Sequence, residues 1–442
     1  MWEGGALCLV GVAADSGLPL FCRPPRPQLP FSLIGSLNAV HMFGGGAGAA
    51  LRGATAPGLQ LAWGGYGHSI TLIALSSAPG TSGPALRRLL DSAFSAMVLV
   101  LGLDELVPVR NVERLKRDLR SCFGLIDSLL SAAGGLGAGL GPPRWPLPPG
   151  PPRDSLQERL ESFAGGAQTG LGCLLGGGRV VLGTPQWWAL PPPDLALLGA
   201  LLGGTPPGAS ARDLPVYLPH SSPTVPHRLL QLRLLPGVGV ALLCGPRPPL
   251  QHVISQLVPQ VWGPVLELLR GCARPPPPAL PPGVLAYLLI HRQQRWTQSG
   301  LGPGGAQGRV LPPQRCGAAL GHLLELLSPH FCPLDEGGGP GAAPPAPPAP
   351  APAAVSPLSP PSPPSPPSPP SPPSPLSPPS PPSPVSPVSP SLVSLSLASH
   401  SALLLPLPEL LLLLLLPPRP PRGALRGLAR GALGALGPPG TR

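Results

Sequence analysis

The stretch NVERLKRDLRSCFGLIDSLL, residues 111–130, decides how the N-terminal part of this chain folds. Its apolar residues recur every three or four positions, which is the spacing of one side of an α-helix. Asn111 is placed to cap the first turn by accepting a backbone N–H, and the pair Gly134–Gly135 ends the pattern. The sequence therefore predicts one amphipathic helix that lies on a sheet formed by the preceding residues. Its apolar stripe consists of Val112, Leu115, Leu119, Cys122, Ile126 and Leu129.

Short apolar runs and two longer helical patterns precede this helix. One helix is expected at Phe31–Phe43, with Leu33, Leu37 and Val40 on one side, and another at Ala85–Leu101. The element order strand-strand-helix-strand-strand-strand-helix-helix is satisfied by an antiparallel five-stranded sheet with one helix on one face and two on the other. Strands are expected at residues 6–14, 18–23, 59–63 and 69–77.

A second unit partly repeats this pattern. We assign residues 1–133 to the first domain, residues 134–153 to a Gly/Pro-rich linker, and residues 154–273 to the second domain. Asp154 is expected to cap the first helix of the second domain, and the long helical pattern at residues 249–272 is interrupted by two prolines. Further helix is expected at residues 194–202, and strands at residues 171–175, 179–182, 216–218, 228–235 and 238–244.

A third domain starts at residues 280–336, with a strand at residues 284–292 and a helix at residues 315–327. Residues 337–402 then interrupt it with Pro/Ala/Gly-rich sequence and Ser-Pro-Pro repeats, which we expect to be disordered because they cannot bury a core. The Leu/Arg-rich tail, residues 403–442, is interpreted as a remnant of the third domain. The predicted fold class is α+β, with tandem domains of a helix-flanked, antiparallel five-stranded sheet, the third interrupted by a disordered Pro/Ser-rich insert.

The net charge and the spacing of the cysteines indicate which classes of partner the protein binds and which redox compartment it occupies. The net charge is +11, and the last 24 residues hold five arginines and no acid. A nucleic-acid binder would show a dense basic patch with interleaved aromatic residues, whereas this arginine-containing tail has no aromatic residue. The pattern instead favours weak attraction to an anionic membrane surface or an acidic partner. The 8 cysteines show no CxxC spacing, so a reducing cytosol is the simpler interpretation.

Two apolar segments could be mistaken for targeting or membrane segments. No basic residue precedes the run at residues 6–14, so a strand is favoured there over a signal peptide. The leucine run at residues 410–416 is shorter than the ~20 residues that a membrane span requires.

Motifs for enzyme chemistry are missing from the sequence. The one lysine, Lys116, follows leucine rather than glycine, which argues against a P-loop, and no GxSxG or HExxH pattern occurs. His220 and Ser221 are adjacent, but neighbouring side chains of an extended segment point to opposite faces, so a Ser–His pair is not expected. We therefore predict a protein that is not an enzyme and that has no cofactor and no metal.

Several residues indicate protein binding, although each has a simpler explanation. Trp187 and Trp188 are more simply a core residue with a half-exposed neighbour than an anchor for a partner. Arg114 and Arg117 belong to a charged helix side that is usually solvated, although so charged a surface could meet an acidic GTPase. His41 and Met42 end an otherwise apolar helix, where core packing or helix capping is favoured over an interface.

Four segments are specific enough to carry a family resemblance. They are PFSLIGSLNAVHMFG (30–44), SITLIALSS (69–77), RNVERLKRDLRSCFGLIDSLL (110–130) and ARDLPVYLPHSSPTVPHRLLQLRLLP (211–236). These segments resemble the Fuzzy family of planar cell polarity proteins, over residues 6–273 closely and over residues 274–332 loosely. The resemblance implies three consecutive longin domains, each an antiparallel sheet with flanking helices.

The resemblance also implies a function. Members of this family pair with Inturned and, with the WD-repeat protein Wdpcp, form a ciliogenesis and planar polarity effector complex. The pair is expected to be a guanine-nucleotide exchange complex for a ciliary Rab-type small GTPase, affecting hedgehog signalling and intraciliary or vesicle transport. The implied location is the cytoplasm, the cytoskeleton and the ciliary basal body. The family has no catalytic residue or cofactor to transfer.

The family also suggests where the partner binds. In such pairs the first longin domains pack side by side through their first helix and a neighbouring strand, which here points to Phe31–Phe43. The implied interface residues on this helix are Phe31, Ile34, Asn38, His41 and Met42.

The Pro/Ser-rich segment departs from the family pattern. Translated intron sequence from a GC-rich locus is favoured as its origin. A genuine insert would instead provide ligands for SH3 or WW domains and Ser-Pro phosphorylation sites. The alternative function is therefore a scaffold that acts through its Pro-rich segment.

Overall fold

The computed structural model describes most of residues 7–306, together with residues 316, 319, 320, 323, 392–396 and 400–436. Within residues 7–306 the gaps are 26–28, 47–50, 79–80, 134–150, 205–209, 274–278 and 292–295. Most of the predicted linker and of the Pro/Ser-rich segment, and most of the helix predicted at residues 315–327, lie outside the described residues.

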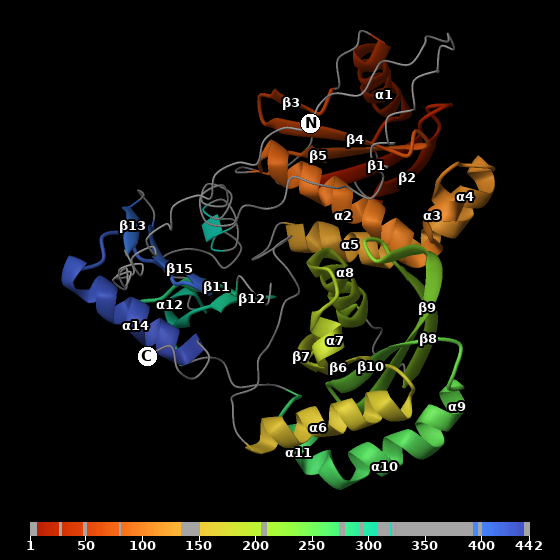
Figure 1. Cartoon of the computed structure of the whole chain (residues 1–442). Helices are drawn as coiled ribbons and strands as arrows, with labels where there is room; N and C mark the ends of the chain where they lie inside the picture. The colour runs from red at the N-terminus through yellow and green to blue at the C-terminus, as the bar shows by residue number, and fades with distance from the viewer. Residues whose placement is uncertain are drawn as a thin grey trace, which may run out of the picture.

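Three five-stranded sheets with the same topology confirm the predicted fold class. Their strand orders are β2-β1-β5-β4-β3, β7-β6-β10-β9-β8 and β12-β11-β15-β14-β13. All pairings are antiparallel. In each sheet the fifth strand in chain order pairs with the first strand, so these two strands lie side by side near the middle of the sheet. Helices flank each sheet (Figure 1).

The first sheet is covered on both faces. On one face, α1 packs over Val10 and Ile73; on the other, α2, α4 and α5 cover Leu9 and Leu72. One helix therefore lies on one face and the others on the opposite face, as the sequence predicts. The strands are β1 (Leu7–Ala13), β2 (Pro19–Arg23), β3 (Gly53–Ala56), β4 (Leu59–Tyr66) and β5 (Ile70–Ser76). The helices are α1 (Phe31–Gly46), α2 (Gly83–Leu101), α3 (Leu103–Leu106), α4 (Val112–Asp118) and α5 (Phe123–Ala133).

The prediction of a single continuous helix at residues 111–130 is wrong, because the helix is interrupted. A 3-10 turn, η1 (Leu119–Cys122), separates α4 from α5. Here Ser121 Oγ donates to the carbonyl of Asp118 at 2.6 Å, and such a side-chain bond competes with regular helix bonding. The cap is as predicted, because Asn111 Oδ1 accepts from the backbone N–H of Arg114 at 2.9 Å. The central stripe residues Leu115, Leu119, Cys122 and Ile126 are buried in the core.

The second domain repeats the arrangement around a longer hairpin. Its helix α6 (Pro151–Gly166) begins three residues before Asp154, which lies in the first turn and is not the cap that the sequence predicts. Its other helices are α7 (Pro185–Trp188), α8 (Pro192–Gly203), α9 (Leu250–His252), α10 (Val258–Trp262) and α11 (Leu266–Arg270), with a π turn η2 (Val253–Leu257) and a 3-10 turn η3 (Gly263–Val265) between the last three. Its strands are β6 (Leu171–Gly176), β7 (Arg179–Gly183), β8 (Ala211–Leu218), β9 (Ser222–Leu235) and β10 (Val238–Cys244).

The third sheet joins residues that are far apart in sequence. Strand β11 (Ala286–His291) pairs with β15 (Leu410–Leu416), whose seven leucines are all buried. Helix α14 (Leu425–Leu436) covers one face, and Cys316, Leu320 and Leu323 pack on the other, which is why this strand is apolar on both sides. The remaining elements are β12 (Trp296–Leu301), α12 (Pro303–Ala306), β13 (Val393–Ser396), β14 (Ser401–Pro406) and the 3-10 turn η4 (Arg422–Ala424).

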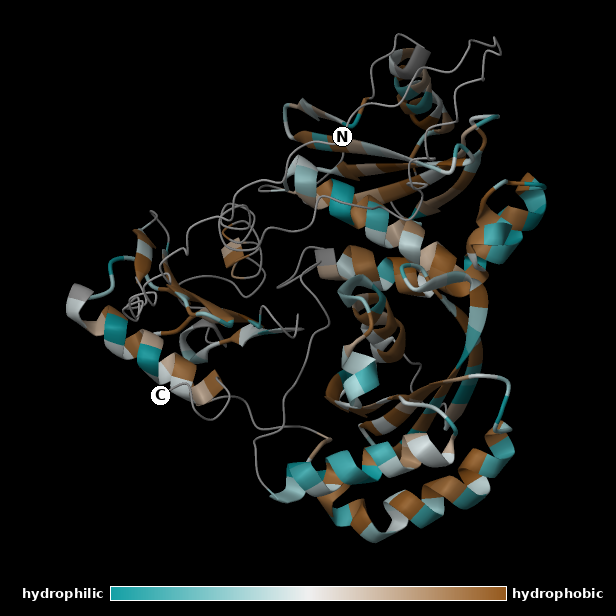
Figure 2. Cartoon of the chain, viewed as in Figure 1, coloured by the Kyte–Doolittle hydropathy of each residue, from teal (hydrophilic) through white to brown (hydrophobic). Residues whose placement is uncertain are grey.

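The first two domains share apolar packing. Ala96 and Leu99 of α2 and Leu125 of α5 belong to the same buried cluster as Leu198 of α8 and Val216 of β8. Helices α2 and α5 therefore lie between the first and the second sheet (Figure 1), and hydrophobic residues make up much of both helices (Figure 2). Among the described residues, no helix combines the length and the hydrophobicity that crossing a membrane requires.

Candidate partner-binding surface

Helix α1 is anchored on the face of the first sheet that is turned away from the second domain (Figure 1). It begins after Pro30, whose carbonyl accepts from the N–H of Ile34 at 3.2 Å. Ile34 and Asn38 are each only 6% exposed, and the indole N–H of Trp63 donates to the carbonyl of Leu37 at 3.2 Å. These contacts fix the helix on β4 and determine which of its sides faces outward.

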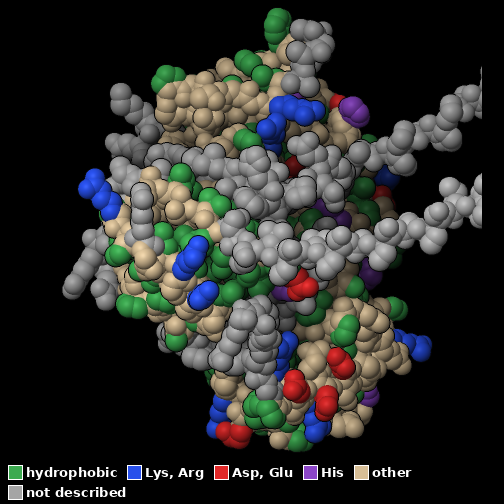
Figure 3. Space-filling model, turned by 60° about the vertical axis from the view of Figure 1, so that its left-hand side comes forward, with side chains coloured by type: hydrophobic (Ala, Val, Ile, Leu, Met, Phe, Trp, Pro, Cys, Tyr) green, Lys and Arg blue, Asp and Glu red, His purple; other side chains and the backbone are tan. Residues whose placement is uncertain are grey.

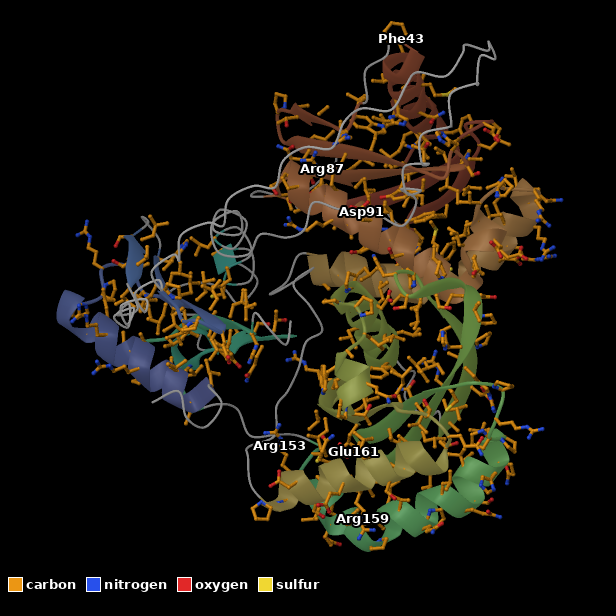
Figure 4. All side chains as sticks on the ribbon, in the orientation of Figure 1. Phe43, Arg87, Asp91, Arg153, Arg159 and Glu161 are labelled. Atoms are coloured by element: carbon orange, nitrogen blue, oxygen red, sulfur yellow. The ribbon has the colours of Figure 1, made fainter. Side chains whose placement is uncertain are left out.

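The exposed part of α1 is uncharged and combines large apolar side chains with small or hydroxyl-bearing residues such as Ser32 and Ser36. We call the following residues the α1 apolar surface: Phe31, Leu33, Val40, Met42 and Phe43, which are 67%, 39%, 54%, 54% and 81% exposed. No Asp, Glu, Lys or Arg lies between Arg26 and Arg52. Phe43 lies at the outer end of the helix and points away from the molecule (Figure 4). Several large exposed apolar side chains on one helix are a feature of protein interaction sites.

The prediction of which side of this helix is buried is wrong. Leu33 and Val40 were expected on the same side as Leu37, yet both are exposed while Leu37 is partly buried. The reason is that apolar residues occur on every side of α1, so their spacing does not distinguish an inner from an outer side. Of the predicted interface residues, Phe31 and Met42 are exposed and His41 is half-buried.

Arg114 and Arg117 lie on a different part of the first domain, in α4. Arg114 forms ion pairs with Glu105 and Asp118, each at 3.4 Å, and Arg117 pairs with Asp118 at 3.5 Å. Both arginine side chains remain largely exposed, and surface pairs of this kind contribute little to stability. The arginines are therefore accessible but already paired with acids of their own domain.

A cleft of about 310 Å³ adjoins Arg114 at the junction of the first two domains. It is lined by α3, α4 and the end of β8, including Asp104, Arg110 and Tyr217. Its lining includes both acidic and basic side chains, so it offers no single charge to a ligand.

Trp187 and Trp188 lie in the second domain, in the short helix α7. Trp187 is 1% exposed and packs in the core, while Trp188 is half-buried. A Cβ atom at Gly183 would lie 2.8 Å from Trp187 Cδ1 and 2.8 Å from Trp188 Nε1, so both indoles pack over that glycine. Thr184 Oγ1 accepts from the N–H of Trp187 at 3.3 Å and caps this helix.

The nine predicted residues therefore do not form one surface. Those on α1, those on α4 and the tryptophans of α7 lie on separate elements that pack in three different apolar clusters. Leu33, Val40 and Phe43 are the exposed residues that reasoning from the sequence missed, and the lack of charge from residue 27 to residue 51 is the signal that could have identified them.

His220 and Ser221 meet on one carboxylate, contrary to the expectation from sequence. Asp194 is 0% exposed, and its Oδ1 accepts from the backbone N–H of His220 at 3.1 Å and lies 2.9 Å from His220 Nδ1. Its Oδ2 accepts from Ser221 Oγ at 2.8 Å. The two residues lie in a turn, closed by Ser221 N–H donating to Leu218, and not in an extended segment. Since the serine hydroxyl donates to Asp194, this arrangement ties the β8–β9 turn to α8 and does not activate a nucleophile.

The described part of the chain has no group of three His, Cys, Asp or Glu side chains that could hold a metal ion. On the face shown in Figure 3, the described Lys and Arg side chains are scattered in small groups and form no continuous basic surface. The α1 apolar surface is thus the most distinctive exposed feature of the first domain.

Comparisons with known proteins identify relatives of the chain. Residues 9–129 match the family model described as "First Longin domain of FUZ, MON1 and HPS1", and residues 169–263 match "Second Longin domain of FUZ, MON1 and HPS1". The "Protein fuzzy homolog" of Rattus norvegicus is 48% identical over 304 residues, which cover 66% of this chain and 72% of that protein. The homologue of Homo sapiens is 45% identical over 342 residues, covering 75% and 81%, and that of Xenopus tropicalis is 44% identical over 298 residues, covering 66% and 71%.

Proposed function

The chain belongs to the Fuzzy family of longin-domain proteins, and from this we propose that it is a planar cell polarity effector required for cilium assembly. It acts as a non-catalytic subunit that pairs with Inturned. The pair is a guanine-nucleotide exchange complex for a ciliary Rab-type GTPase, and Wdpcp is a further partner. Through it the chain affects hedgehog signalling and intraciliary or vesicle transport, at the basal body and in the cytoplasm.

The α1 apolar surface is the observation that supports this proposal most directly. An interface of standard size buries about 800 Å² on each partner. Two phenylalanines that are 67% and 81% exposed, with three aliphatic or thioether side chains beside them, supply a large part of such an area. Aromatic anchors surrounded by smaller apolar contacts are typical of the centre of a protein interface. We place Inturned on this surface.

The mechanism needs no chemistry from this chain. Pairing of the two first domains through α1 builds a broader composite surface, on which the GTPase docks. Docking then distorts the nucleotide site of the GTPase from outside and speeds release of the bound nucleotide. The exposed, charged side of α4, with Arg114 and Arg117, is a candidate contact for an acidic region of the GTPase, and it lies on a different element from α1.

Nucleotide-release kinetics test the exchange role. The full chain is purified with Inturned, and release of a fluorescent GDP analogue from the Rab-type GTPase is followed with and without the pair. We expect clear acceleration by the pair and none by the chain alone. Release at the same rate with the pair as for the GTPase alone would reject the exchange role, even if the pair itself is stable.

A scaffold that acts through the Pro-rich segment is the alternative. Strand β13 starts at Val393 and pairs with β14, so a deletion that tests the segment must end before that strand. Deletion of residues 340–390 leaves Inturned binding and exchange unchanged if the first proposal holds. Loss of partner capture with Inturned binding intact would favour the scaffold.

A weak contact with an anionic membrane is also proposed, on the basis of α14. Arg426 and Arg430 are one turn apart on this helix and both are exposed, while Ala429 and Leu433 face the core. Co-sedimentation of the full chain with vesicles that contain phosphatidylserine, at low and at physiological salt, measures this contact.

A further inference from the structure

Two cysteine thiols touch beneath α1. Cys8 lies in β1 and Cys22 in the neighbouring strand β2, and their Sγ atoms are 3.5 Å apart. Cys8 is 2% exposed, whereas Cys22 is only partly buried. Cys122, Cys173, Cys244, Cys272 and Cys316 are buried in other parts of the described structure.

The register of the strands explains why the two thiols meet. Cys22 is opposite Val10, and Cys8 precedes Val10 by two residues, so Cys8 and Cys22 are diagonal neighbours on the same face of the sheet. Both belong to the apolar cluster that α1 covers through Ile34. Each thiol is thus the hydrogen-bond partner of the other in an otherwise apolar layer.

We propose that Cys8 and Cys22 are a site of reversible oxidation, at which hydrogen peroxide converts the two thiols into a disulfide. The thiolate of Cys22 attacks one oxygen of the peroxide, the O–O bond breaks, and the departing hydroxide takes up a proton to become water. Cys22 is then a sulfenic acid. The sulfur of Cys8 attacks the sulfur of Cys22, the S–O bond breaks, and the oxygen leaves as a second water with the proton of Cys8. Two thiols and one peroxide give one disulfide and two waters.

The surroundings make Cys22 the attacking thiol. A hydrogen bond from the thiol of Cys8 lowers the pKa of Cys22 to about 7, against the opposing effect of burial. The backbone N–H of Leu29 and the positive charge of Arg23 act in the same direction. For Cys8, the hydrogen bond to Cys22 and burial both raise the pKa, so this thiol stays protonated until it attacks. Partial exposure and thiolate character are the two properties that favour reaction with peroxide.

The geometry also predicts that the disulfide is easily reduced. An S–S bond is about 2 Å long, so the sulfurs must approach each other by about 1.5 Å. Diagonal neighbours are farther apart than directly opposite residues, which means that closure strains the two strands. Strand β2 is at the edge of the sheet and has a single neighbour, which allows the movement. Strained disulfides are the reducible ones, and this property suits a reversible modification.

Peptide mass spectrometry of the full chain tests the proposal. The reduced protein is exposed to a small excess of hydrogen peroxide, remaining thiols are blocked with N-ethylmaleimide, and the digest is searched for linked peptides. We expect the peptides that contain Cys8 and Cys22 to be joined with the loss of two hydrogen atoms. We expect glutathione to separate them again. The absence of this linked pair, with both thiols recovered as N-ethylmaleimide adducts, would overturn the proposal.

Three variants test the assignment of roles. Cys22→Ser removes the disulfide and leaves Cys8 reduced. Cys8→Ser leaves Cys22 able to react with peroxide but without its partner, so dimedone, which traps sulfenic acids, labels Cys22. Cys122→Ser is the matched control, because it removes a buried thiol from the same domain and leaves the Cys8–Cys22 disulfide unchanged. Dimedone labelling at Cys8 in the Cys22→Ser variant, at the level seen for Cys22, would refute the assignment of the attacking thiol.

Discussion

Replacement of Phe43 by alanine tests the partner surface quantitatively. Phe43 is 81% exposed in the isolated chain. A phenylalanine can bury about 200 Å², so about 160 Å² of this side chain is available to a partner. Alanine keeps part of that area, and we take about 100 Å² as lost. At about 25 cal/mol per Å², the cost is about 2.5 kcal/mol, or about a 60-fold weaker affinity for Inturned.

A pair of valines provides the matched control. Val40 on α1 is 54% exposed and Val225 on β9 is 60% exposed, so the same substitution can be made at two similarly exposed sites. Val40→Ala removes about half as much area as Phe43→Ala and should weaken binding by about 1 kcal/mol, roughly fivefold. Val225→Ala should leave the affinity unchanged, because Val225 lies outside the α1 apolar surface.

Isothermal titration calorimetry of each full-length variant with Inturned measures these effects. The side chains are exposed, so all three variants should keep the thermal midpoint of the parent chain, and this is checked by circular dichroism. Affinities of Phe43→Ala and Val40→Ala within twofold of the parent would show that α1 is not the docking surface. Equal losses for Val40→Ala and Val225→Ala would show that the effect does not depend on α1.

Four further predictions concern single sites. Gly102 has φ +85, and a Cβ there would lie 2.8 Å from Tyr217 Cζ, so Gly102→Ala should destabilise the chain by about 1–2 kcal/mol in thermal unfolding. Gly124 lies in α5 with nothing within 4 Å of an added Cβ, so Gly124→Ala should instead stabilise by up to about 1 kcal/mol. Asp194→Ala removes a fully buried carboxylate and leaves its donors unpaired, which should cost about 3 kcal/mol in urea unfolding, with little dependence on salt. Alkylation of Cys22 by iodoacetamide should rise with pH around a midpoint near 7, and Cys8→Ala should move that midpoint upward, since it removes the hydrogen bond that is the main cause of the low pKa.

Local chemistry made parts of this fold predictable. The stripe from Leu115 to Ile126 was visible because charged residues occupy the opposite side of the helix, and the cap at Asn111 is a short-range contact. The break at η1 was not visible, because the spacing of the apolar residues is unchanged by it; the hydroxyl of Ser121 bonds to the carbonyl of Asp118 at this point.

Contacts between residues that are far apart in the chain could not be predicted from the sequence. Strand β12, which pairs with β11, carries Thr297 and Gln298, two polar residues that are buried in the folded domain. The leucines of β15 indicated an apolar segment, but its partner β11 is more than a hundred residues earlier in the chain. The outward side of α1 was likewise undetermined, since only the contacts of Ile34 and Trp63 with their neighbours decide it.

The shared core of the first two domains bears on where a partner can bind. One face of the first sheet is covered by α2, α4 and α5, and two of these helices are packed against the second domain through Leu99 and Leu125. That side is therefore occupied within the chain. Among the described helices, α1 covers the opposite face, and α1 has large apolar residues among both its buried and its exposed side chains. A solvent-exposed helix normally has a polar outer side, so the composition of α1 is explained if a second protein covers it. Substitution of the outer residues should then affect pairing and leave the fold intact, whereas substitution of Ile34 should destabilise the first domain itself.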